Sequence, residues 1–250
     1  MEVHAHTHTE RKRFTHYLWE FLMLFLAVTL GFFMENQREH YAERRRAHEF
    51  AESLVADLIK DTAQLNSDIN QIDFVAPRID TFRVLAQTKK ISDLPGGAWY
   101  YYARFASWYF DFNSNNATLE QLKSSGSLRY FRNKEVISAI AQYDKICRSI
   151  KDLYNYEQPI INSTIELRCK IFNAFNFDPV MDFNTPREKI DSFMQKDIKF
   201  LDNNLSKLIE MANYCQATIK DYKNRKFAYQ RALLLAGDLL QLLKKEYRLK

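Results

Sequence analysis

A single carboxylate, Glu20, lies inside an apolar run near the N-terminus of the chain. An acid in such a segment can exchange protons or face a partner helix, because charge inside a membrane is costly unless it is compensated. His16 lies one helical turn before Glu20, so the two side chains can instead pair with each other at the level of the lipid headgroups. Both interpretations follow from the same two residues.

The helical phase of nearby residues adds a further hypothesis. At about 100° per residue, Ala27 and Gly31 fall within roughly 20° of Glu20, and His16 lies about 40° away. A pair of small residues four apart lets two membrane helices approach closely. We therefore predict that a stripe formed by His16, Glu20, Ala27 and Gly31 contacts a second copy of the chain or another membrane protein.

Residues 99–112 form a block that is rich in aromatic side chains. Tyr and Trp bury large areas while keeping a polar tip, which suits a bundle core, a partner surface or a ligand pocket. Core packing is the favoured interpretation. The alternative of an exposed interaction patch rests on Trp99, Tyr101, Tyr102 and Trp108.

The other residues with reactive side chains form no catalytic pattern. Three histidines alternate in the N-terminal tail, at His4, His6 and His8, where the spacing gives no fixed metal geometry. Carboxylates such as Asp57, Asp61 and Glu120 lack the Glu-x-x-His pairing of di-iron bundles. Glycine-rich phosphate loops, nucleophile elbows and HExxH motifs are absent from the sequence. We predict no enzymatic activity, cofactor, metal or small-molecule substrate.

The three cysteines are Cys147, Cys169 and Cys215. Their odd number and the lack of a CxxC spacing argue against a disulfide framework or a zinc site. Each lies on an apolar helical face, so we expect buried structural thiols.

Residues 14–34 predict a transmembrane helix, because about 20 mostly apolar residues span a bilayer core. The competing interpretation is a secretory signal peptide, since residues 11–13 are basic. No small-x-small cleavage site follows, so we favour an uncleaved anchor in membrane lipid. Basic residues flank both ends, and those at 11–13 lie closer to the membrane, which favours a cytoplasmic N-terminus and a periplasmic main domain.

Composition predicts long helices and gives no evidence for nucleic acid binding. The chain has only 5 Gly and 5 Pro in 250 residues, so turns are scarce. Its net charge of +5 is scattered along the sequence rather than gathered in a basic patch. We therefore predict an all-α protein that does not bind nucleic acid.

Helical periodicity divides the chain into a tail (residues 1–13), the anchor (14–34), a charged stalk (35–49) and a bundle domain (50–250). Pro77 is expected to interrupt the first helix of the bundle. Asn133 is expected to cap a helix with a heptad seam, and a helix of about 43 residues is expected from Leu205 onward. Such lengths predict an elongated antiparallel bundle with long heptad-patterned helices.

Four segments carry a resemblance: HAHTH at residues 4–8, YLWEFLMLFLAVTLGFF at 17–33, ENQREH at 35–40 and TLEQLKSSGSLR at 118–129. They resemble uncharacterised single-pass membrane proteins of Bacteroidota-type bacteria. The resemblance implies a bacterial inner-membrane protein with a helical extramembrane domain, and it implies no known activity.

Two functions follow from these patterns. The first is a membrane-anchored helical scaffold, adaptor or sensory module that mediates protein–protein interaction. The second is a single-span subunit of an ion-driven membrane complex in which Glu20 exchanges protons. Glu20→Gln separates them, since an adaptor keeps its function and a proton carrier loses activity while still assembling.

Overall fold

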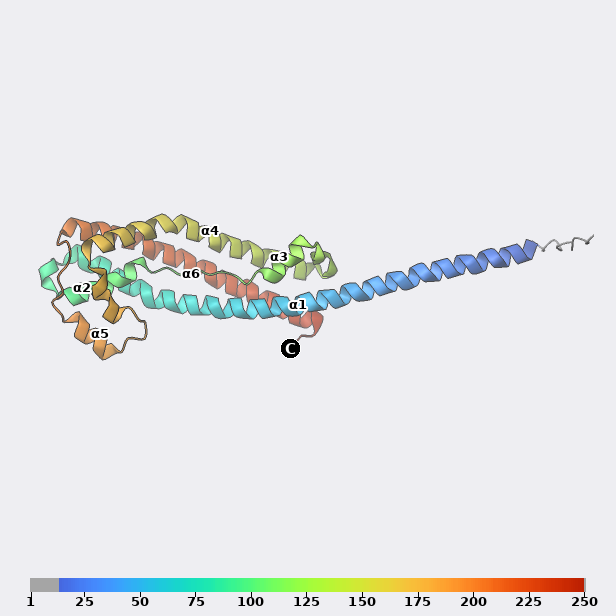
Figure 1. The fold of residues 1–250 in the computed structure, drawn as a ribbon, viewed down its shortest axis with the longest axis horizontal. Coiled ribbons are helices and arrows are strands. Elements are labelled where there is room, and N and C mark those ends of the chain that lie inside the picture. Colours follow the sequence, from blue (N-terminus) through green and yellow to red (C-terminus); the bar gives the residue numbers. More distant parts are fainter. Residues whose placement is uncertain (1–13, 250) are drawn as a thin grey trace, which may run out of the picture. The chain divides into compact units, whose positions relative to one another are not determined.

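The computed structural model describes residues 14–249, and every regular element within that range is helical (Figure 1). This confirms the predicted all-α class. The chain divides into an N-terminal unit, Met1–Phe50, and a main unit, Ala51–Lys250. The α-helices are α1 (Phe14–Thr88), α2 (Gly96–Ala103), α3 (Ala117–Ser124), α4 (Lys134–Ile171), α5 (Arg187–Met194) and α6 (Leu205–Tyr247). The short 3-10 helices are η1 (Ile91–Asp93), η2 (Arg104–Ser107), η3 (Ser127–Tyr130) and η4 (Ala174–Val180).

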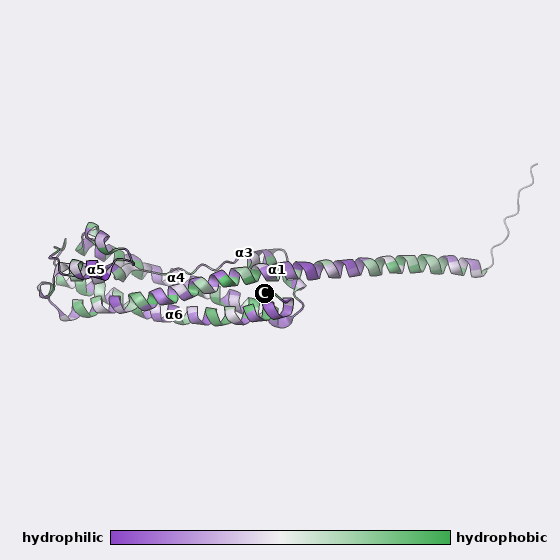
Figure 2. Ribbon diagram, turned by 90° about the horizontal axis from the view of Figure 1, so that it is seen from below, coloured by the Kyte–Doolittle hydropathy of each residue, from purple (hydrophilic) through white to green (hydrophobic). Residues whose placement is uncertain are grey.

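The described part of the N-terminal unit is entirely helical and belongs to α1. It contains one stretch that is long and apolar enough to cross a membrane, and none of that stretch is buried. Figure 2 shows this hydrophobic band followed by a hydrophilic one. In the hydrophilic part, Arg38 Nη2 lies 2.5 Å from Glu35 Oε1, an ion pair at i,i+3. The N-terminal unit is thus compatible with a single-pass anchor followed by a charged segment.

The interruption predicted at Pro77 is wrong, because α1 continues through it to Thr88. Proline removes one backbone hydrogen bond and crowds the preceding turn, which usually breaks a helix. Here Val75 and Ile79 are both fully buried on either side of it, so the core-facing stripe continues in phase. The Pro77 carbonyl also accepts a hydrogen bond from Thr81 Oγ1 at 2.9 Å. Burial of the apolar face offsets the lost bond.

The two long helices α4 and α6 pack extensively against each other. Both views of the ribbon show them side by side in the main unit (Figures 1 and 2). Helix α6 has 43 residues, as predicted from Leu205 onward. The predicted cap is also confirmed, because the Asn133 side chain accepts a hydrogen bond from Glu135 N at the start of α4.

Two glycines bring α2 into contact with the chain that follows α5. A methyl group at Gly97 would overlap the Phe193 carbonyl, and one at Gly96 would overlap the backbone of Ile198. Gly97 N donates to Lys196 O at 2.9 Å, which fixes this approach. The sequence Leu-Pro-Gly-Gly at residues 94–97 is typical of a turn, and here it allows close backbone packing.

Residues 108–116 have no regular secondary structure, yet they lie against α1 and α6. Side chains satisfy their carbonyl groups in place of a helix or sheet. Tyr222 Oη donates to Trp108 O, and Tyr229 Oη donates to Phe110 O at 3.2 Å. Gln64 Nε2 donates to Asp111 O at 3.3 Å from the α1 side. Only Phe110 and Phe112 of this segment are buried, and hydrogen bonds to the carbonyl groups hold the irregular backbone beside them, because an unpaired buried carbonyl is costly.

Candidate functional site

A cavity of about 490 Å³ lies within the main unit. Side chains from α1, α3, α4 and α6 line it, together with the irregular residues 112–116. This volume falls within the range of small-molecule sites, roughly 300–1,000 Å³. Its wall combines leucine and phenylalanine side chains with carboxylates, amides and a phenol.

Asp61 is the polar centre of the cavity wall. It is 1% exposed, and Asn115 donates to its Oδ1 through both the backbone N and Nδ2, each at 2.7 Å. Tyr143 Oη donates to the other oxygen at 2.7 Å. Burial raises the pKa of Tyr143 well above its usual value, so the phenol keeps its proton and remains a donor. Asp61 thereby joins α1, α4 and the irregular segment.

Asp57 lies one helical turn before Asp61 on α1 and lines the same cavity. Thr118 Oγ1, in the first turn of α3, donates to Asp57 Oδ2 at 2.5 Å. Thr118 and Gln121 have the spacing of a capping box, in which the threonine side chain would cap the start of the helix. In the structure the Thr118 side chain bonds to Asp57 on α1, so it links α3 to α1 instead of capping its own helix.

Charged side chains surround the outer part of the cavity. Lys123 Nζ lies 2.7 Å from Asp144 Oδ1 and 3.2 Å from Glu120 Oε1. Arg148 Nη2 lies 3.1 Å from Asp144 Oδ2. Arg148 and Lys151 are the basic side chains that line the cavity, and Lys123 lies beside its acidic residues. The outer carboxylates are therefore paired with cations.

The prediction of three buried thiols is correct for Cys215 and wrong for Cys169, which is exposed. The buried face of α4 in this region consists of Ile161, Thr164, Leu167 and Ile171. Cys169 lies outside this face. Cys147 is half-buried at the cavity wall.

Thiol alkylation should distinguish the three cysteines. Burial raises the pKa of Cys147 to about 11 and that of Cys215 to about 12. Because the thiolate is the nucleophile, we expect iodoacetamide at pH 8 to modify both at least about a hundredfold more slowly than an unfolded cysteine. Cys169 should react first in the folded protein. Peptide mass spectrometry with and without denaturant checks this order, and rapid labelling of folded Cys147 would contradict it.

Two residues of the predicted membrane stripe contact each other. His16 Nε2 lies 3.0 Å from Glu20 Oε1, and both side chains are about half exposed. This pairing agrees with the headgroup interpretation, and the proton-exchange interpretation stays a prediction. Farther along the stripe, no atom lies within 4 Å of a methyl group built at Gly31, and Ala27 is exposed. The small-residue part of the stripe is therefore uncovered in the N-terminal unit.

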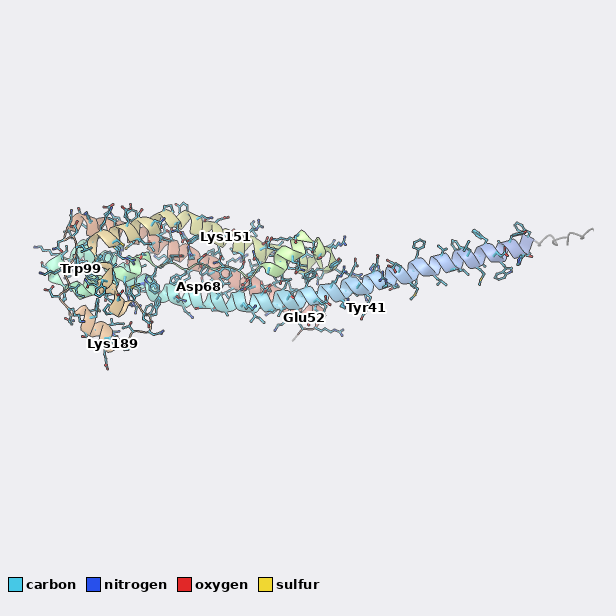
Figure 3. The ribbon with its side chains drawn as sticks, viewed as in Figure 1. Tyr41, Glu52, Asp68, Trp99, Lys151 and Lys189 are labelled. Atoms are coloured by element: carbon cyan, nitrogen blue, oxygen red, sulfur yellow. The ribbon has the colours of Figure 1, made fainter. Side chains whose placement is uncertain are left out.

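The aromatic block contributes to the core of the main unit. Trp99 and Tyr101 are buried, whereas Tyr102 and Trp108 are half-buried. Trp99 lies at the end of the main unit that carries α2 and α5 (Figure 3), where Nε1 donates to Ile91 O at 3.2 Å. The Trp108 ring packs edge-on against Phe183, with 3.9 Å between centroids. This placement favours core packing over the alternative of an exposed interaction patch.

A buried ion pair between Glu157 on α4 and Arg225 on α6 is a feature that sequence reasoning missed. The two side chains are 5% and 1% exposed. Burial raises the pKa of Glu157, and the charge of Arg225 opposes that effect. The next residue of α6, Lys226, is also a cation. In the structure Lys226 pairs with Asp73 at the surface, with Nζ 2.6 Å from Oδ1.

Within residues 14–249, no group of three or more His, Cys, Asp and Glu side chains is placed to hold a metal ion. The histidines at positions 4, 6 and 8 lie outside the described residues. No protein-family model, curated protein or solved structure matches the chain.

Proposed function

We propose that this chain is a membrane-anchored helical scaffold or adaptor, or a sensory module, that mediates protein–protein interaction in a bacterial cytoplasmic membrane. The observation that carries the proposal is the apolar stretch of residues 14–34, none of which is buried. Uncovered apolar surface of this extent needs lipid or a partner, because exposing it to water is unfavourable. The main unit is assigned to the periplasmic side.

The main unit serves in this proposal as an elongated antiparallel bundle with heptad-patterned helices. Two contacts together support the antiparallel direction, because the partner that comes later along α4 is joined to the partner that comes earlier along α6. Asn133, before α4, donates to Glu246 near the end of α6 at 3.0 Å. Glu157 in the second half of α4 pairs with Arg225 in the middle of α6. A long bundle of this kind offers a stiff surface for a protein partner.

The partner contact is assigned to the stripe that contains Ala27 and Gly31. Association between membrane helices depends on close packing, and small residues allow it. His16 and Glu20 extend the stripe with a polar pair. The partner is a second copy of the chain or another membrane protein with a complementary helix.

The double substitution Ala27→Leu and Gly31→Leu is expected to abolish association, because two bulky side chains would hold the helices apart. A reporter assay for helix dimerisation in a bacterial membrane, together with crosslinking of the full chain in native membranes, measures the effect. The matched control is Thr29→Leu, a small-to-large change on the opposite face. Unchanged association in the double variant, or equal loss in the control, would refute the role of the stripe.

A further inference from the structure

The inner and outer carboxylates of the cavity differ in how their charge is compensated. Asp144 and Glu120, in the outer part, form ion pairs with Lys123. Asp61 and Asp57 accept hydrogen bonds from an amide, a backbone N–H, a phenol and a hydroxyl, all of which are neutral donors. A buried carboxylate is costly unless it is paired or fully hydrogen-bonded. The inner wall thus carries negative charge beside open volume.

The rest of the inner wall is apolar. Leu54, Leu58, Phe112 and Ile140 line the cavity, and each is buried in the main unit. A ligand that fills this space must therefore present a hydrocarbon or aromatic body to these side chains and a polar group to Asp57 and Asp61. A site with apolar walls and a few placed polar groups is typical of small-molecule binding.

We propose that the cavity binds a small organic ammonium ion, in which a primary amine contacts Asp57 and an apolar body packs against the leucine and phenylalanine side chains. Asp57 is half-buried and faces the cavity one helical turn from Asp61. A cation there would compensate the charge of both carboxylates. Amine binding is a function beyond the adaptor role, and it does not depend on that role.

Calorimetric titration of the full chain in detergent with phenethylamine, isopentylamine and cadaverine tests this site. Phenylacetate, which has the body of the first amine and the opposite charge, is the ligand control. We expect at least one amine to bind saturably and to raise the thermal midpoint, whereas phenylacetate does neither. Failure of all three amines, or equal binding of phenylacetate, would overturn the proposal.

Two matched variants locate the site. Asp57→Asn should weaken amine binding about tenfold or more, because it removes a charge-assisted hydrogen bond. Glu120→Gln makes the same change in charge at an exposed outer position, and binding should change less than about threefold. Circular dichroism confirms that each variant is folded. Equal loss in both variants, or no loss in Asp57→Asn, would contradict the assignment.

Discussion

Glu157→Gln is expected to lower the free energy of unfolding by about 3–5 kcal/mol, because it leaves the Arg225 charge buried without its counter-ion. Water cannot hydrate the unpaired guanidinium group, since the Arg225 side chain is only 1% exposed. Among the described residues, its Nε already has no hydrogen-bond partner. Urea unfolding of the full chain, followed by circular dichroism, gives the change in free energy.

The neighbouring surface pair provides the control for this variant. Lys226→Met breaks the pair with Asp73, and it should cost no more than about 1 kcal/mol because both side chains remain in contact with water. Replacing both buried partners, with Glu157→Leu and Arg225→Met, should recover most of the loss, since no unpaired charge then remains. A loss below about 1 kcal/mol in Glu157→Gln would show that the buried pair does not stabilise the main unit.

Gly97→Ala is expected to destabilise the main unit by about 3 kcal/mol or more, at or above the upper end of the usual cost of overpacking. The added methyl group would overlap the Phe193 carbonyl, which belongs to the backbone and cannot rotate away. To relieve the overlap, α2 would have to separate from the end of α5 and lose the bond between Gly97 N and Lys196 O. The fall in thermal midpoint measures the effect.

Gly237→Ala is the matched control, because Gly237 lies inside α6 with no atom within 4 Å of an added methyl group. Alanine is the better helix former by about 0.5–1 kcal/mol, so this variant should be unchanged or slightly more stable. Equal stability of the two variants would contradict the close packing of α2 against the chain after α5.

The sequence predicted a helix well when its two termini and its apolar stripe are determined by residues close together in the chain. Asn133 caps α4 because its side chain reaches a backbone N–H two residues away, and α6 follows its continuous apolar spacing. Pro77 misled the prediction because its local cost is offset by burial of Val75 and Ile79 in the core of the main unit. Long-range packing of this kind leaves no local signal.

The candidate cavity was beyond sequence reasoning for the same reason. Asp57 and Asp61 could be identified as carboxylates on a helix, yet their partners are far away in the chain. Thr118 and Tyr143 are separated from them by 61 and 82 residues. The ion pair of Glu157 with Arg225 joins residues 68 apart. Only the completed fold shows which polar side chains meet.

The irregular residues 108–116 have a consequence for how the main unit folds. They have no helix of their own, and their carbonyl groups depend on tyrosines that lie more than 110 residues later in the chain. Contacts of such long range are costly to form early, because the entropy of loop closure opposes them. We therefore expect the segment to dock late in folding. Substitutions of Tyr222 or Tyr229 should then mainly accelerate unfolding and leave the folding rate almost unchanged, which stopped-flow refolding and unfolding rates measure.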